Sequence, residues 1–272
     1  MRLTTFAAAA LAATLFTAGA ADAAAVLAGG YYFNGTLASS VAGAPSLVAT
    51  DPLGRNAFVT DTVNGVSRTV YSIGGAASNG SQGGLTFDST GLLSNAQGYS
   101  VALTLDFASN SGWRRILDVA NRSTDNGFYV NVDNSLAVYG ASGTSAKYDN
   151  NGYNNIVLTV GDGSIKAYLQ GGVSVTLTDN GVMNLPANGL INLFLNNTAG
   201  SGQNEWSPVK IATAEFYSGV MSAEQVAAFT GDVRQPPTGA VPEPASWALM
   251  ICGFMGVGGV LRRRRMGAIV SA

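Results

Sequence analysis

The feature that most restricts the fold is an alternation of apolar and polar residues with a period of two. It is clearest in residues 99–107, where Tyr99, Val101, Leu103, Leu105 and Phe107 alternate with Ser100, Ala102, Thr104 and Asp106. Side chains along a β-strand point to opposite faces in turn, so this pattern predicts a strand with one buried face. The chain is therefore expected to fold mainly into β-structure.

The same signal recurs along the chain. Further strands are predicted near residues 128–132, 136–139, 156–160, 165–169, 173–177, 191–195 and 210–217. Turn sequences rich in Gly, Asn and Asp separate them, and those at 161–164 and 171–172 predict a three-stranded meander. Many short strands joined by such turns are typical of an all-β sandwich or jelly roll.

One helix is predicted after the last strand. Ser222 is a suitable N-cap, and Gln225 three residues later completes a capping-box pattern before an apolar run that reaches Phe229. Gly231 is expected to end this helix. Residues 235–240 contain Pro236 and Pro237 and are interpreted as a linker, because proline favours an extended chain and adds no core.

Missing residue types exclude several kinds of chemistry. The 272-residue chain contains no His, which removes imidazole bases, the usual Ser-His and Cys-His nucleophile pairs, and His-bearing zinc sites. Its one Cys, Cys252, lies in a C-terminal apolar run, so the preceding domain has neither a disulfide nor a thiol nucleophile. These absences exclude from the domain the mechanisms that need an imidazole or a thiol.

Charge argues against a nucleic-acid partner. The chain has 16 acidic and 14 basic side chains, and leaving out Asp22, Glu243, Arg2 and Arg262–Arg265 gives 14 and 9 for residues 26–237. The net charge of this part is thus about −5, and it offers no basic surface for phosphates.

The N-terminus has the order of a secretory signal peptide. Arg2 is followed by an apolar run from Phe6 to Ala18, and small residues then offer three small-x-small cleavage sites, at Ala18/Ala20, Ala21/Ala23 and Ala23/Ala25. Residues 1–25 are interpreted as this signal, which implies handling by the secretion machinery and signal peptidase. A buried helix is the alternative interpretation.

The C-terminus has the order of a membrane anchor. Residues 245–261 form a 17-residue apolar span, long enough at about 1.5 Å per residue to cross most of a bilayer core. Arg262, Arg263, Arg264 and Arg265 follow and are expected to stop translocation. Residues 266–272 would then be a short cytoplasmic tail, and an ordinary permanent single-pass anchor is the alternative.

Residues 241–265 resemble the PEP-CTERM sorting domain, in its Pro-Glu-Pro-x-x-Trp-Ala variant. The matching residues are Pro242, Glu243, Pro244, Trp247, Ala248, Met250, Ile251, Gly253, Phe254, Val257, Gly258 and Arg262–Arg265. The resemblance implies that an exosortase, a membrane-embedded cysteine protease, recognises Pro242, Glu243, Pro244 and Trp247 and cuts nearby. The flanking prolines hold this segment extended, as a protease requires.

That resemblance also implies a setting. The family belongs to Gram-negative bacteria that make exopolysaccharide. The protein would be exported, held for a time in the inner membrane, and then moved to the cell surface or extracellular matrix.

Residues 26–234 resemble the laminin-G-like, concanavalin A-like jelly roll. The best-matching stretches are YSVALTLDF, RRILDVANRSTDNGFYVNVDNSLAVYG, NNIVLTVGDGSIKAYLQGG, INLFLNNT and KIATAEFYSGVMSAEQVAAF, preceded by an opening strand near residues 31–37. The resemblance implies a two-sheet sandwich of the kind that includes glycan-binding modules and glucanases.

The sequence argues against a glucanase. Those enzymes need two carboxyl groups a few ångströms apart, which Glu-x-Asp-x-x-Glu spacing places on one face of a strand. The domain has three Glu, at positions 205, 215 and 224, and no two acids in the matching stretches have that spacing. We therefore expect a protein that is not an enzyme.

Two kinds of binding site remain open. Oxygen-bearing side chains gather in predicted loops and could hold Ca²⁺, although turns favour the same residues: Asp118, Asn121, Asp125, Asn126, Asp133, Asn134, Asn196 and Asn197. Aromatic rings could form a platform for sugars, although strands also bury such rings: Trp113, Tyr129, Tyr139, Tyr148 and Tyr153. The main hypothesis is a surface protein that binds glycan or exopolysaccharide. A matrix protein without a specific ligand is the alternative, and a glycan-cleaving enzyme is the weaker one.

Overall fold

The computed structural model describes residues 24–109, 111–199 and 204–229. The predicted signal peptide up to residue 23, linker, sorting signal, anchor and tail lie outside these residues. Within the described residues, no helix is long and apolar enough to cross a membrane.

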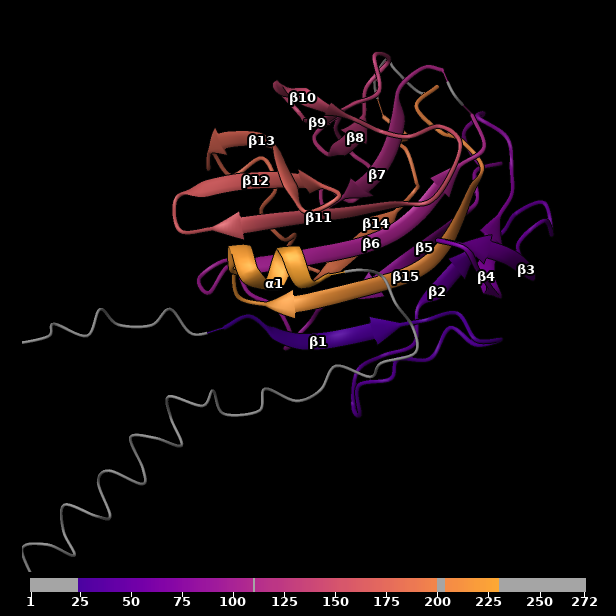
Figure 1. Cartoon of the computed structure of the whole chain (residues 1–272), viewed down its shortest axis with the longest axis horizontal. Coiled ribbons are helices and arrows are strands. Elements are labelled where there is room, and N and C mark those ends of the chain that lie inside the picture. The colour runs from indigo at the N-terminus through magenta and orange to yellow at the C-terminus, as the bar shows by residue number, and fades with distance from the viewer. Residues whose placement is uncertain (1–23, 110, 200–203, 230–272) are drawn as a thin grey trace, which may run out of the picture. The chain divides into compact units, whose positions relative to one another are not determined.

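The described chain forms two antiparallel β-sheets (Figure 1). The larger sheet has the order β13 (Gly172–Thr178), β12 (Ser164–Leu169), β11 (Asn154–Gly161), β6 (Tyr99–Phe107), β15 (Val209–Ser218), β4 (Val66–Ile73) and β3 (Ala57–Val63), with β1 (Val26–Tyr31) also pairing with β15. The smaller sheet has the order β10 (Ala141–Lys147), β9 (Ser135–Val138), β8 (Phe128–Val130), β7 (Arg114–Asp118), β14 (Leu190–Leu193), β5 (Gly84–Asp88) and β2 (Val48–Thr50).

The main core lies between these sheets. Val101, Leu103 and Leu105 of β6 share one buried cluster with Phe128 of β8 and Leu136 of β9. The predicted all-β sandwich is therefore confirmed, as is the meander formed by β11, β12 and β13.

Strand β6 has the predicted bounds but not the predicted single buried face. Ser100, Ala102 and Thr104, expected on the exposed face, are all fully buried. The reason is a second cluster on the outer face of the larger sheet, where Ala102 lies with Met221 and with Val226 of helix α1 (Ala223–Ala228). The alternation identified the strand correctly, but the sequence did not show that the helix covers its second face.

Helix α1 carries the predicted capping box. The side chain of Ser222 accepts a hydrogen bond from the Gln225 backbone, and the Gln225 side chain accepts one from the Ser222 backbone. The helix ends at Ala228, with Phe229 as its C-cap, which is earlier than the predicted Gly231.

The opening of the domain also differs from the prediction. The first strand runs from Val26 to Tyr31 rather than near residues 31–37. Phe33 has a φ of 54°, in the left-handed region, so the chain cannot continue as a strand there.

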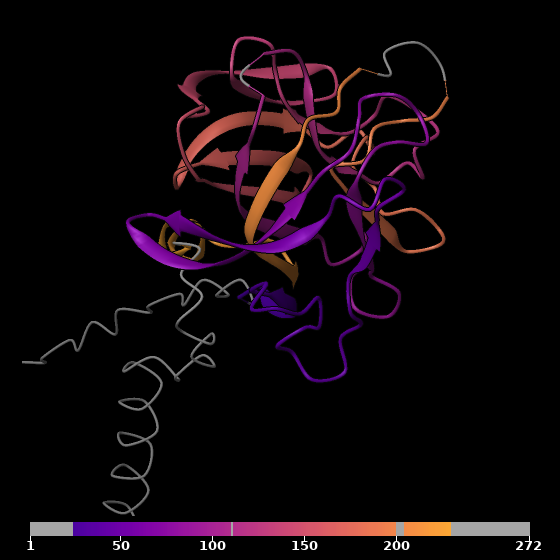
Figure 2. The same cartoon turned by 90° about the vertical axis from the view of Figure 1, so that its right-hand side faces the viewer.

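The hairpin of β3 and β4 was not predicted. The two strands form a curved ribbon at one edge of the larger sheet (Figure 2). Asn64 and Gly65 join them, with φ of 50° and 80°, the positive values that a two-residue hairpin turn requires. The Asn-Gly pair between two alternating runs was the signal that could have identified it.

Candidate functional site

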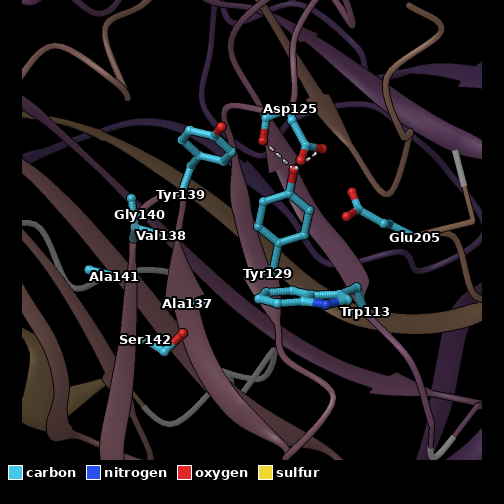
Figure 3. Close-up of a pocket in the computed structure, with 10 residues that line it drawn as sticks. All are labelled: Trp113, Asp125, Tyr129, Ala137, Val138, Tyr139, Gly140, Ala141, Ser142 and Glu205. Atoms are coloured by element: carbon cyan, nitrogen blue, oxygen red, sulfur yellow. Dashed lines mark hydrogen bonds between the residues drawn. The ribbon is translucent and has the colours of Figure 1, made fainter. Parts of the chain in front are cut away.

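A pocket of about 380 Å³ opens on the outer face of the smaller sheet (Figure 3). Its lining residues come from the position before β7, the β7–β8 loop, β8, β9, the β9–β10 turn, β10 and the segment before β15: Trp113, Asp125, Tyr129, Ala137, Val138, Tyr139, Gly140, Ala141, Ser142 and Glu205. Aromatic rings and carboxyl groups are the groups in this set that can bind a ligand strongly.

Strand register explains why these side chains share a face. Arg115 pairs with Tyr129, Tyr129 with Ala137, and Ala137 with Ser142, and directly paired residues of antiparallel strands point to the same side. Trp113 and Tyr139 lie two positions from members of this row, so they point to that side too. The intervening Ile116, Phe128 and Val138 are buried in the core between the sheets.

The rings of the pocket differ in exposure. Trp113 is 37% exposed and Tyr139 is 49% exposed, whereas Tyr129 between them is 3% exposed. Trp113 packs edge-on against Tyr129, with ring centroids 5.7 Å apart. Two aromatic surfaces are thus available to a ligand, and a buried third ring supports one of them.

Arg115 holds the acidic side of the pocket together. Its guanidinium is fully buried and forms an ion pair of 2.8 Å with Asp118 and one of 3.2 Å with Asp125. It also donates a hydrogen bond to the Tyr129 hydroxyl and lies over that ring, 4.8 Å from the centroid. Burying the Arg115 charge together with that of Asp118 is tolerable because both terminal nitrogens of the guanidinium bind oxygen atoms, and only Nε lacks a partner among the described residues.

Glu205 reaches the same guanidinium from a distant part of the sequence. The backbone carbonyl of Glu205 accepts a 2.8 Å hydrogen bond from the backbone N–H of Arg115. The carboxylate Oε2 of Glu205 lies 3.7 Å from Nη2 of the Arg115 guanidinium. The pKa of Glu205 is raised to about 7, mainly by burial and then by the negative charge of Asp125, although the charge of Arg115 acts to lower it. This carboxyl group therefore changes its protonation near neutral pH.

Three of the five aromatic residues predicted as a sugar platform line this pocket: Trp113, Tyr129 and Tyr139. Tyr148 instead lies in the core, where its hydroxyl accepts a 2.8 Å hydrogen bond from the Phe107 N–H. Tyr153 lies against the larger sheet and donates a 3.0 Å hydrogen bond to Asp61. Alternation could not distinguish rings on the outer face from rings in the core.

The three Glu considered for catalysis lie apart from one another. Glu205 is in the pocket, Glu215 of β15 accepts hydrogen bonds from Tyr32 and Tyr217, and Glu224 is in the first turn of α1. The pocket does bring together Asp125 and Glu205, a pair that local spacing could not identify because 80 residues separate them.

Three of the loop residues considered for Ca²⁺ bind protein groups. Asp118 accepts from Arg115 and Arg122, Asp133 pairs with Lys147, and Asn134 accepts from Arg114. Among the described residues, no group of three or more Asp, Glu, His or Cys side chains could hold a metal ion.

No protein-family model and no curated protein sequence matches the chain. Solved structures do. Domain 4 of AbnA, a GH43 extracellular arabinanase of Geobacillus stearothermophilus solved with arabinotriose, is 17% identical, with a TM-score of 0.56 over 75% of this chain and 98% of that one.

Two toxin structures show the same fold. The binding domain of Paraclostridial Mosquitocidal Protein 1 is 10% identical, with a TM-score of 0.53 over 74% of this chain and 51% of that one. Botulinum neurotoxin type C, which interacts with two ganglioside molecules, is 12% identical, with a TM-score of 0.50 over 75% of this chain and 50% of that one. At these identities the comparisons establish a shared β-sandwich fold.

Proposed function

We propose that this domain is a glycan-binding module of the laminin-G-like, concanavalin A-like type, and that the pocket on β7–β10 is its sugar site. The observation that carries the proposal is the exposure of the Trp113 and Tyr139 rings beside two carboxyl groups. Rings stack on the apolar faces of sugars, and carboxylates accept hydrogen bonds from hydroxyl groups. A sugar residue needs both kinds of contact at once.

The structural comparisons support the same proposal. The arabinanase domain was solved with arabinotriose, and the neurotoxin interacts with gangliosides, so two neighbours in fold bind carbohydrate. Fold alone does not assign a function. The argument therefore rests on the pocket of this chain.

Binding is tested with a glycan array and the isolated domain, followed by titration of the best glycan. We expect saturable binding that Trp113→Ala weakens at least about tenfold, since an aromatic anchor supplies much of the energy of a small site. Phe58→Ala is the matched control, because Phe58 is 36% exposed but lies on β3 of the larger sheet. Absence of saturable binding would favour a matrix protein without a specific ligand.

Glycan cleavage is a second candidate function. Its support is the meeting of Asp125 and Glu205 in one pocket, together with the raised pKa of Glu205, which suits a general acid. We propose binding without turnover. Reducing ends released from a bound polysaccharide by the unmodified domain, and lost in Glu205→Gln, would overturn that proposal.

We also propose that the protein is exported and sorted by an exosortase, on the sequence of residues 1–25 and 241–265. Replacing Pro242 and Pro244 by Ala is expected to retain full-length protein in the inner membrane, as cell fractionation would show. Mass spectrometry of the mature surface form gives an independent test. A chain that still ends in Ser271 and Ala272 would instead indicate a permanent anchor.

The structure favours some of the signal-peptide cleavage sites over others. Ala25 is buried, and its N–H and carbonyl bond to the side-chain amide of Gln225, at 3.2 and 3.0 Å. Cleavage after Ala25 would remove these contacts. We propose cleavage after Ala23 or further upstream, which N-terminal sequencing would test.

A further inference from the structure

The charged groups of the pocket indicate which class of glycan it accepts, an inference that rests on the glycan-binding function proposed above. The two charged side chains that line the pocket, Asp125 and Glu205, are both acidic. Among the described lining residues there is no Lys or Arg. A ligand in this pocket therefore meets hydrogen-bond acceptors and negative charge.

Arg115 does not cancel this charge. One guanidinium faces three carboxyl groups, since Asp118, Asp125 and Glu205 all lie within 3.7 Å of its nitrogen atoms. Its side chain is fully buried, and both terminal nitrogens already bind protein oxygens, so it is not available to an anionic ligand. The surplus charge on this side of the pocket is negative whenever the carboxyl groups are ionised.

One acceptor atom in this group has no donor within hydrogen-bond distance among the described residues. Oε2 of Glu205 is buried, and within the described residues it has no hydrogen-bond partner, while the nearest guanidinium nitrogen is 3.7 Å away. A buried acceptor without a donor is costly, so a ligand that supplies one gains free energy. An ammonium group, with three N–H donors and a positive charge, satisfies this acceptor best.

The aromatic surfaces favour the same kind of ligand. The faces of Trp113 and Tyr139 carry negative electrostatic potential, and cations bind to such faces, most strongly to tryptophan. Exposed rings beside carboxyl groups that outnumber their one guanidinium form a site for a cation that also has an apolar surface. A neutral sugar would use the rings but not the charge.

We infer that the pocket recognises a glycan bearing free ammonium groups, that is, an amino sugar without its N-acetyl group. Sugar rings would stack on Trp113 and Tyr139, and the ammonium group would lie beside Asp125 and Glu205. The net charge of about −5 for residues 26–237 attracts such a polymer at longer range. Glycans rich in carboxylates are disfavoured, because like charges in one pocket repel.

The test compares two ligands that differ in this group alone: the trimer of β-1,4-linked glucosamine and its fully N-acetylated form. Calorimetry is performed with the isolated domain at about pH 7 and low salt, where part of the amines is protonated and Glu205, whose pKa is raised to about 7, is partly ionised. We expect the glucosamine trimer to bind about tenfold more tightly, and this preference to decrease with added salt.

Variants show whether the preference comes from the pocket. Asp125→Asn and Glu205→Gln should each reduce it to about twofold or less, with folding checked by circular dichroism. Glu224→Gln is the control, because it removes the same charge from an exposed position in α1 and should leave the preference unchanged.

The outcomes separate this inference from the proposed function. Equal binding of both trimers, or a preference for the N-acetylated form, overturns the ammonium inference but supports glycan binding if Trp113→Ala abolishes it. An equal loss of preference in Glu224→Gln also overturns the inference, since the effect would then come from net charge. If neither trimer binds and the glycan array finds no other sugar, both proposals fail.

Discussion

Two neighbouring arginines on β7 stand in contrasting surroundings. Arg115 points to the outer face, where its buried guanidinium faces the carboxyl groups of Asp118, Asp125 and Glu205. Arg114 points into the core and is equally buried, but the structure shows no ion pair between it and any described residue. Successive residues of one strand thus bury a positive charge in two different ways.

Neutral groups stabilise the charge of Arg114. Asn134 and Asn150 accept hydrogen bonds of 2.5 and 3.0 Å through their side chains, and the Ser109 carbonyl accepts one of 2.8 Å. The guanidinium also lies over the rings of Phe107 and Tyr148, at 5.8 and 5.3 Å from their centroids. Burial lowers the pKa of Arg114, yet arginine remains charged in proteins.

Comparing the partners of Arg114 with those of Arg115 shows which groups are needed to bury a guanidinium and which exceed that need. Arg114 shows that amides, carbonyls and rings are sufficient to bury a guanidinium in this fold. Arg115 has three carboxyl groups where a single one would suffice, and two of them line a pocket. The excess of acid is therefore not explained by the burial of Arg115, which supports a role in ligand binding.

The largest predicted effect is that of Arg115→Met. The substitution leaves Asp118 buried without its cation, and removing one partner of a buried ion pair is strongly destabilising, so we expect a loss of about 3 kcal/mol of unfolding free energy. Urea titration followed by tryptophan fluorescence measures it. Adding Asp118→Asn should recover part of the loss, and a lack of recovery would show that the ion pair is not its cause.

Arg114→Met is expected to have a smaller effect, about 2 kcal/mol. Its hydrogen-bond acceptors lie in loops where water can replace the lost donors, and the Met side chain keeps part of the packing against Phe107 and Tyr148. The same titration provides the measurement. A loss of stability greater than that of Arg115→Met would contradict the expectation that the arginine held by neutral groups is easier to replace than the one held by carboxyl groups.

The smallest predicted effect concerns pH. Because the pKa of Glu205 is raised to about 7 from its ordinary 4.5, this group favours the folded state fully below about pH 4.5, and that contribution disappears as the pH rises to about 7. Glu205→Gln removes the dependence. Relative to this variant, the unmodified domain should lose about 1–2 kcal/mol of stability across that interval, after allowance for partial exposure.

Urea titrations of both proteins at several pH values check this prediction. The carboxyl groups of Asp61, Asp88 and Glu224 have lowered pKa values, so the stability changes that they cause fall below this interval. Burial raises the pKa of Asp106, but Asp106 is present in both proteins, so its contribution cancels in their difference. A constant stability difference between the two proteins would contradict the raised pKa. Glu224→Gln is again the control, and its stability difference should not change above about pH 5.

The sequence predicted the parts of the fold that depend on local pattern. Tyr99–Phe107 and the capping box at Ser222 and Gln225 were both located from residues a few positions apart. The cover on the outer face of β6 was missed, because it depends on α1 packing from more than a hundred residues away. Local periodicity carries no information about such a partner.

The pocket was predictable only in part, for the same reason. Trp113, Tyr129 and Tyr139 were candidates as aromatic residues, but pairing Asp125 with Glu205 requires the contact between β7 and the segment before β15. The two adjacent arginines in a strand otherwise rich in apolar residues were the best local sign of a buried charged network. Their partners could not be identified without the register of the sheets.

The contact between the first and the last elements of the domain affects how the chain folds. Strand β1 pairs with β15, and Ala25 bonds to Gln225, a contact that spans 200 positions. Since a ribosome makes the chain from its N-terminus, β1 has no strand to pair with until β15, near the end of the domain, has been synthesised. Long-range pairing of this kind slows folding and exposes strand edges. A truncation that ends before Val209 is therefore expected to leave an aggregation-prone chain rather than a smaller folded unit.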